Sequence, residues 1–329
     1  MKSKKLVDYG KYGYLFSIPF ILAFLVFSLY PILFTFYIGF SDFAGMTATV
    51  KESKVLWSEP FKNFVTVFKA NLFRKSFGNT VIIWTMNFIP QMGLALLLTA
   101  WFTDRRSKVK GQGIFKILFY MPNIITAATV AVLFTQIFAY PSGPINTTLI
   151  KLGLSEKGVN FMLTPGRVRG VVAFIQFWQW YGYTMVMLIS GVIGINPEIF
   201  EAADLDGANR VQTFFLITLP CIRTIMLYVL VTSLIGGLNM FDIPALYAMD
   251  RGDAGGYTVN MYIKDVAFTG KQRYNLAAAA SIIMFVIIVL LSLVLFYIMR
   301  DKDEIRLKKE QKAWMKAEIE RRKNEGRAS

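Results

Sequence analysis

Long, unbroken runs of apolar residues constrain the fold of this 329-residue chain more than any other feature. Six such runs, separated by charged stretches, cover residues 14–40, 81–102, 114–139, 171–195, 225–247 and 276–299. A soluble helix would show a polar face every few residues, and these runs do not. Several reach the roughly 20 residues that a helix needs to cross a bilayer core. The sequence therefore predicts an all-α integral membrane protein with about six transmembrane helices.

The first run also has to be weighed against a cleaved signal peptide. It is too long for the apolar region of such a peptide, and no Ala-x-Ala site closes it. We therefore interpret it as the first membrane helix. Prolines inside or at the ends of the runs predict kinks, because neighbouring membrane helices can satisfy the freed carbonyls. They are Pro19, Pro31, Pro90, Pro122 and Pro244.

The distribution of Lys and Arg predicts the orientation. The net charge is +15, and the basic residues flank the apolar runs, as they do in cytoplasmic segments of membrane proteins. An even number of helices puts both basic termini on one side, which we expect to be cytoplasmic. The same side then holds the tail 300–329 and a second basic group: Arg105, Arg106, Lys108, Lys110, Lys116, Arg210 and Arg223. A nucleic-acid partner is not needed to explain the charge.

Two absences exclude whole classes of chemistry. The chain has no histidine, which rules out a histidine triad, a histidine metal site and a histidine proton relay. Its single cysteine, Cys221, cannot form an internal disulfide. The chain also lacks a Gly-x-x-x-x-Gly-Lys-Ser/Thr loop, so it cannot hydrolyse ATP by that means. We expect no catalytic residue, cofactor or metal on this chain.

A polar stretch between the fourth and fifth runs, residues 196–220, has the pattern of a helix, a glycine and a second helix. Asn196 suits the N-cap and Pro197 the first helical position. Acidic residues in this first helix complement the positive end of its dipole. Gly207 is expected to end the helix, since glycine readily adopts the left-handed conformation.

The same stretch is suited to contact with another protein. Ala202 and Ala203 are small, so a partner can approach the backbone closely. A second helix is expected to begin at Ala208 and to stop at Pro220. Its apolar residues are expected to pack under the membrane helices: Phe214, Phe215 and Leu219. The interpretation is a compact helix–glycine–helix projection on the cytoplasmic side.

Three short segments of this stretch resemble the EAA loop of ABC importer permeases: Glu201-Ala202-Ala203, Asp206-Gly207-Ala208 and Ile217-x-Leu219-Pro220. Further segments are similar to the carbohydrate-uptake branch of that family, namely 119–122, Phe177-Trp178, Gly182, 237–242 and 276–280. The resemblance implies a coupling helix between the fourth and fifth membrane helices that inserts into a groove on a separate ATPase subunit. The docking residues that it implies are Glu201, Ala202, Ala203, Asp206, Gly207 and Ala208.

The resemblance also implies an assembly in a bacterial plasma membrane. This chain would pair with a second, homologous permease subunit, and two ATP-binding subunits would hold ATP and magnesium. An extracytoplasmic sugar-binding protein would deliver a carbohydrate, and membrane lipid would surround the helices. The chain then divides into a cytoplasmic N-terminus (1–13), the importer transmembrane domain (14–299) and a basic cytoplasmic tail (300–329).

Other functions remain alternatives. An ion-coupled secondary sugar transporter usually has ionisable groups inside the membrane, and here little more than Asp242 near one helix end is available. A membrane enzyme would need catalytic groups that the chain lacks. A channel would need a selectivity filter, and no segment resembles one.

Sugars are bound by amide or hydroxyl groups and by aromatic faces. Gln176, Trp180 and Tyr183 share one face of the fourth helix by their i, i+4, i+7 spacing. On the fifth helix, Gly237 would leave space for a ligand. The family resemblance makes these two helices the expected sugar-lining ones, with Ser233, Gly237 and Asn239 as further candidates. The alternative is that aromatic residues mark the membrane interface and small ones mediate helix packing.

Overall fold

The computed structural model describes residues 10–45, 49, 52–106, 110–248, 255–300, 310–315 and 317–318. Lys108, most of the predicted N-terminal segment 1–13 and most of the predicted tail 300–329 lie outside these residues. The chain divides into two compact units. Unit 1 comprises Met1–Ile83, Phe134–Val172 and Leu238–Ile287, and unit 2 comprises Trp84–Leu133, Ala173–Gly237 and Ile288–Ser329.

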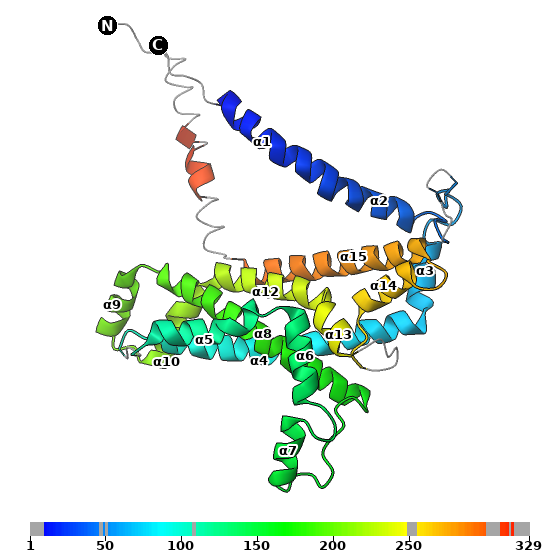
Figure 1. Cartoon of the computed structure of the whole chain (residues 1–329). Coiled ribbons are helices and arrows are strands. Elements are labelled where there is room, and N and C mark those ends of the chain that lie inside the picture. Colours follow the sequence, from blue (N-terminus) through cyan, green and yellow to red (C-terminus); the bar gives the residue numbers. More distant parts are fainter. Residues whose placement is uncertain are drawn as a thin grey trace, which may run out of the picture. The chain divides into compact units, whose positions relative to one another are not determined.

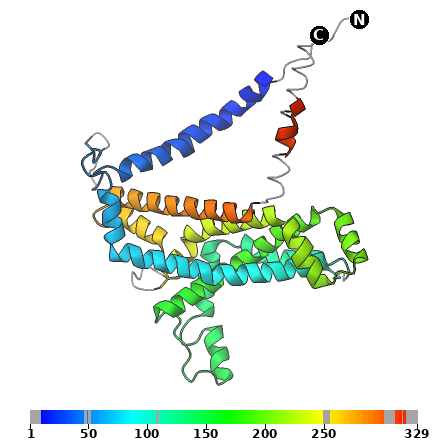
Figure 2. The same cartoon turned by 180° about the vertical axis from the view of Figure 1, so that it is seen from behind.

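The described residues are almost entirely helical (Figures 1 and 2). In chain order the helices are α1 (Gly10–Phe24), η1 (Leu25–Leu29), α2 (Tyr30–Gly39), α3 (Lys62–Lys69), α4 (Asn71–Thr103), α5 (Gln112–Ile124), α6 (Ala127–Ile137), α7 (Pro144–Lys151), α8 (Pro165–Ile193), α9 (Pro197–Leu205), α10 (Arg210–Gln212), η2 (Thr213–Thr218), α11 (Leu219–Cys221), α12 (Arg223–Leu238), α13 (Asp242–Tyr247), α14 (Val259–Phe268) and α15 (Tyr274–Met299). The prediction of an all-α chain is confirmed.

The described helices include up to six membrane spans. Four are long and apolar enough by themselves: Tyr12–Gly39, Asn71–Thr103, Arg223–Tyr247 and Tyr274–Met299. Two bent pairs of helices, α5 with α6 and α8 with α9, bring the number to six. The chain is therefore a multi-pass membrane protein, as the apolar runs predict.

The third predicted helix, 114–139, is not one straight helix. α5 and α6 meet at an angle of 94°, and Ile125 between them has an extended backbone. The carbonyl of Ile125 accepts a hydrogen bond from Nε2 of Gln179 at 3.2 Å, and Oγ1 of Thr126 accepts one from the amide of Thr129 at 3.3 Å. Side chains thus satisfy the backbone at the break, which hydropathy alone does not reveal.

Two π-helical segments precede prolines. η1 ends two residues before Pro31, and η2 ends two residues before Pro220. A proline in a continuous helix lacks an N–H and clashes with the carbonyl four residues earlier. In a π turn, backbone hydrogen bonds join residues five apart instead of four, which changes the carbonyl that a following proline meets. In η2, Oγ1 of Thr218 also donates to the carbonyl of Thr213, five residues earlier, at 3.1 Å. The helix ends at Cys221, one residue after the predicted stop at Pro220.

The core of unit 2 joins the ends of three membrane helices. Its buried members include Leu98 and Phe102 of α4, Leu188 and Val192 of α8, and Val229 of α12. Phe200 of α9 and Leu219 of α11 pack against this cluster. Apolar burial therefore positions the polar segment 196–220 at one end of these helices.

In unit 1, the short helix α7 lies in a loop, residues 138–164, that we call the α7 loop. Asn146 on this helix is completely buried. Its Nδ2 donates to the carbonyls of Ala139 (2.9 Å) and Val159 (3.1 Å), and its Oδ1 accepts from the amide of Val159 (2.6 Å). One neutral side chain therefore holds both ends of the loop together.

Candidate functional site

Both ends of α9 follow from local sequence. Oδ1 of Asn196 accepts a hydrogen bond from the amide of Glu198 at 3.1 Å, and Pro197 is the first helical residue. At the other end, Gly207 has φ +76°, and the amide of Ala208 donates to the carbonyl of Ala203 at 3.0 Å. This pattern is a Schellman C-cap. The predicted N-cap and the predicted glycine stop are confirmed.

The second helix begins two residues later than predicted. Asn209 is the N-cap of α10, because its Oδ1 accepts from the amide of Gln212 at 2.9 Å. Oε1 of Gln212 in turn accepts from the amide of Asn209 at 2.9 Å. The asparagine with a glutamine three residues later is a capping-box pattern that the sequence already contains.

The outward face of α9 combines apolar and acidic side chains. Leu205 is 89% exposed and Ile199 is 42% exposed, and exposed Ala202 lies between them at three-residue spacing. Glu201 is also exposed. This face has the form of a short apolar stripe with a negative border.

The six predicted docking residues do not all share that face. Glu201, Ala202, Asp206 and Gly207 are exposed, whereas Ala203 is only 5% exposed and faces the core of the chain itself. Ala208 is half-buried. The small size of Ala203 therefore allows close packing within the chain, not close approach by a partner. Leu205, which the sequence did not single out, is the more prominent side chain.

The end of α4 makes several contacts with this segment through Asp104, Arg105 and Arg106, which we call the triplet. The guanidinium of Arg106 forms an ion pair with Asp204, and its Nη2 also donates to the carbonyl of Ala208 at 2.8 Å. One side chain therefore holds both sides of the turn at Gly207. These contacts join residues about a hundred positions apart in the chain.

Arg105 contacts the beginning of α9. Its Nη1 donates to the carbonyl of Pro197 at 3.1 Å, and its Cζ lies 5.7 Å from the centre of the Phe200 ring. Its Nη2 lies 3.7 Å from Oε1 of Glu201. The guanidinium thus meets a carbonyl, an aromatic face and a carboxylate on the first turns of one helix.

Asp104 completes the set. Its Oδ2 lies 3.3 Å from Nη1 of Arg210, the first residue of α10, and its Oδ1 accepts from the amide of Arg106 at 3.0 Å. The triplet therefore touches α9 at both ends and α10 at its start. From the sequence, Arg105 and Arg106 are expected only as positive charges of a cytoplasmic loop, because no local pattern identifies their partners.

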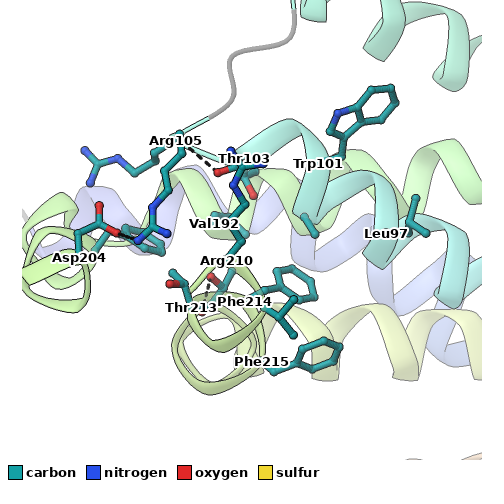
Figure 3. A pocket seen from close by; sticks show the side chains of 16 residues that line it. Leu97, Trp101, Thr103, Arg105, Val192, Asp204, Arg210, Thr213, Phe214 and Phe215 are labelled. Carbon is teal, nitrogen blue, oxygen red and sulfur yellow. Dashed lines mark hydrogen bonds and ion pairs between the residues drawn. The ribbon is translucent and has the colours of Figure 1, made fainter. Parts of the chain in front are cut away.

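A cavity of about 350 Å³ lies beside these contacts in unit 2. Figure 3 shows Leu97 and Trp101 of α4 on one wall and Phe214 and Phe215 of η2 on another. Phe215 is exposed and Phe214 is half-buried, so the predicted packing of this segment under the membrane helices is confirmed for Leu219. Among the described residues, no group of three or more His, Cys, Asp or Glu side chains is arranged to hold a metal ion.

The aromatic candidates for sugar contact lie on α8. Trp180 is 43% exposed and its ring meets that of Tyr183 edge-on, with centroids 5.8 Å apart. Gln176 is half-buried on the same helix. Their role in sugar binding stays a prediction.

Gly237 has a different neighbour from the one expected. A Cβ atom added there would lie 1.9 Å from Cδ1 of Trp84 on α4. The space at this glycine therefore holds the Trp84 indole and not an open ligand site. The indole Nε1 is buried without a hydrogen-bond partner.

The two other candidates lie near this glycine in the sequence. Ser233 is half-buried on α12. Asn239 is exposed in the short break between α12 and α13, where its carbonyl accepts a hydrogen bond from Nδ2 of Asn260 at 2.6 Å.

Comparisons with known proteins agree with this architecture. Residues 68–302 match the family described as the inner membrane component of binding-protein-dependent transport systems. The lactose transport system permease protein LacF of Rhizobium radiobacter is 26% identical, over 89% of this chain and 96% of its own length. The arabinooligosaccharides transport system permease protein AraP of Bacillus subtilis is 29% identical, over 85% of this chain and 86% of its own length.

A solved structure has a similar fold. It is a bacterial alginate ABC transporter in complex with a periplasmic protein that binds an alginate pentasaccharide. The matching chain is 25% identical with a TM-score of 0.72, and the match covers 89% of this chain and 96% of that chain.

Proposed function

Because the chain belongs to the family of inner membrane components of binding-protein-dependent transport systems, we propose that it is one permease subunit of an ATP-driven sugar importer. It is a transport component and not an enzyme, and ATP with magnesium would be bound by separate subunits. Family membership gives no support to the ion-coupled transporter considered as an alternative. The observation that carries the proposal is the projecting α9 helix on a chain of this family.

The substrate class that we propose is carbohydrate. Similarity to permeases named for lactose and for arabino-oligosaccharides supports this class, as does a fold shared with an alginate importer. The exposed Trp180 and its partner Tyr183 offer aromatic faces of the kind that sugars contact. Gln176, Ser233 and Asn239 are the other residues that we propose along the path.

We further propose that α9 is the coupling helix. Its outward stripe of Ile199, Ala202 and Leu205 would enter an apolar groove on an ATPase subunit, and its acidic border would meet basic residues there. Asp206 and Gly207 at the end of the helix lie on the same accessible surface. Two ATP-binding subunits would act on this chain and on a second, homologous permease.

The transport cycle then follows from a two-state arrangement. Closure of the ATPase subunits would displace α9 and change which side of the membrane the path faces. An extracytoplasmic binding protein would deliver the sugar to the opposite side. Both basic termini, with the tail 300–329, would be cytoplasmic by the excess of Lys and Arg on that side.

A charge reversal tests the docking surface. Glu201→Lys introduces a cation where a carboxylate borders the stripe, and we expect the ATPase subunits no longer to co-purify with the chain from native membranes. The matched control is Glu156→Lys, which reverses an exposed carboxylate in the α7 loop and should leave recovery unchanged. Full ATPase recovery with Glu201→Lys, together with unchanged sugar uptake, would contradict docking through α9.

A further inference from the structure

The triplet at the end of α4 lies outside the proposed docking face, yet it contacts both ends of the coupling segment. We propose that Asp104, Arg105 and Arg106 are positioning residues that lock α9 and α10 to α4, so that α4 moves with the coupling helix. The proposal rests on the function proposed for α9. It adds a third membrane helix to the two, α8 and α12, that the chain itself connects to this segment.

Arg106 is the central residue of the triplet. Its guanidinium contacts Asp204, in the last turn of α9, and the carbonyl of Ala208, which follows Gly207. A residue with φ +76° is a point at which the direction of the chain changes. By holding the residues on both sides of that point, Arg106 fixes the angle between α9 and α10.

Arg105 and Asp104 add contacts at the start of α9 and at the start of α10. Arg105 donates to the carbonyl of Pro197, in the first turn of α9, and lies over the ring of Phe200. Asp104 pairs with Arg210 at the start of α10. Since the contacts are spread from residue 197 to residue 210, a rotation or a translation of α9 alone would have to break several of them.

Geometry distinguishes this set from scattered surface ion pairs. Single exposed pairs between flexible side chains contribute little, because two long side chains must be ordered. Here two contacts are charge-assisted hydrogen bonds to backbone carbonyls, and one guanidinium makes a pair and a carbonyl contact at the same time. Lysine cannot reproduce that planar geometry.

The remainder of α4 leads into the membrane helices. Nε2 of Gln91 on α4 donates to Oγ1 of Thr184 on α8 at 2.8 Å, and both residues are buried. Farther along, Trp84 fills the space at Gly237 of α12. A displacement of α4 therefore acts where α4 packs against the two helices proposed to line the sugar path.

The attachment of α10 to α4 can be tested by measuring the distance between spin labels on the two helices. In a Cys221→Ser background, which removes the exposed native cysteine, spin labels would be placed at exposed Ile89 on α4 and exposed Val211 on α10. The complex with its ATPase subunits would be measured without nucleotide and after trapping with Mg-ATP and vanadate. With the triplet intact, we expect the distance between the labels to be the same in both states.

Loss of the Arg106 contacts should allow α4 and α10 to move relative to each other. Arg106→Ala is expected to give a shift of about 2 Å or more on trapping, the size of ordinary helix displacements. Arg106→Lys is expected to give an intermediate shift, because the ammonium keeps a cation with three N–H donors near Asp204 but on a shorter side chain. The exchanged pair Arg106→Asp with Asp204→Arg restores the ion pair but not the carbonyl contact, so it should return part of the way. Lys110→Ala, which removes an exposed cation from the same loop, is the control.

The outcomes separate this proposal from the one on which it rests. Failure of the ATPase subunits to co-purify with the unaltered chain would overturn both. Normal co-purification with the same distance change in the unaltered chain and in Arg106→Ala would overturn only the positioning role proposed for the triplet. Equal thermal stability of the variants, with partial recovery in the exchanged pair, would show that Arg106 acts through position and not through folding.

Discussion

Two short helices in this chain, α7 and α9, are built alike and anchored differently. Each has a proline as its first residue. The α7 loop is held by one buried, neutral side chain, Asn146. α9 is held by the charged, partly exposed side chains of the triplet.

The two anchors differ in how they respond to water and salt. Buried hydrogen bonds between neutral groups are costly to break, because the backbone groups left behind find no water. Exposed ion pairs exchange with water and ions at low cost, and salt screens them. The anchor of α9 is therefore the more sensitive of the two to salt, and in the proposed cycle it would carry α4 along with α9.

The largest effect is expected from the buried anchor. Asn146→Ala removes three hydrogen bonds and leaves the amide and the carbonyl of Val159 without this partner, at a cost of about 3 kcal/mol, while the carbonyl of Ala139 still accepts from the amide of Gly143. Local opening of the α7 loop should rise by roughly two powers of ten, which limited proteolysis of the intact chain would detect.

A neighbouring substitution is the control for that effect. Thr147 is exposed, and its hydroxyl makes one hydrogen bond, to the carbonyl of Ser142 at 3.3 Å. Thr147→Ala should leave the cleavage rate nearly unchanged. Equal cleavage rates for the two variants would remove the distinction between the two kinds of anchoring.

A smaller effect, on binding and not on folding, is expected at the tip of α9. Leu205→Asp places a carboxylate in the proposed apolar stripe and removes a leucine side chain worth about 2 kcal/mol when buried by a partner. Recovery of the ATPase subunits should fall about tenfold or more, while the melting temperature of the chain stays the same because Leu205 is 89% exposed.

The α7 loop offers the matched control. Leu154 is 71% exposed, so Leu154→Asp makes the same chemical change on the other helix's loop. It should not alter ATPase recovery. A similar loss with both variants would indicate a general effect of surface charge and would argue against a specific docking stripe.

The smallest effect is expected from salt. Each exposed pair of the triplet contributes about 0.2–1 kcal/mol, so raising the ionic strength should speed hydrogen exchange in 197–208 by roughly threefold. Exchange in the α7 loop should not respond, because its anchor is neutral and buried. Exchange that rises equally in both segments would show that the triplet does not hold α9 in the isolated chain.

Local sequence was sufficient wherever a structure depends on neighbouring residues. The six spans follow from apolar length, and both ends of α9 follow from Asn196, Pro197 and Gly207, because the capping hydrogen bonds at these ends span no more than five residues. The bend between α5 and α6 was predicted only as a kink at Pro122, and the contact of the Ile125 carbonyl with Gln179, 54 residues away, could not be predicted from local sequence. The start of α10 could have been predicted from Asn209 and Gln212.

The sequence by itself determined a multi-pass helical membrane protein with a polar helix–glycine–helix projection, since hydropathy and helix capping are local properties. Only the tertiary structure decided which residues of that projection are accessible, turning Ala203 inward and leaving Leu205 exposed. It also brought Arg106 to Asp204, 98 residues away, and placed Trp84 at Gly237. Such contacts depend on how distant helices pack, and a pattern of neighbouring residues does not contain that information.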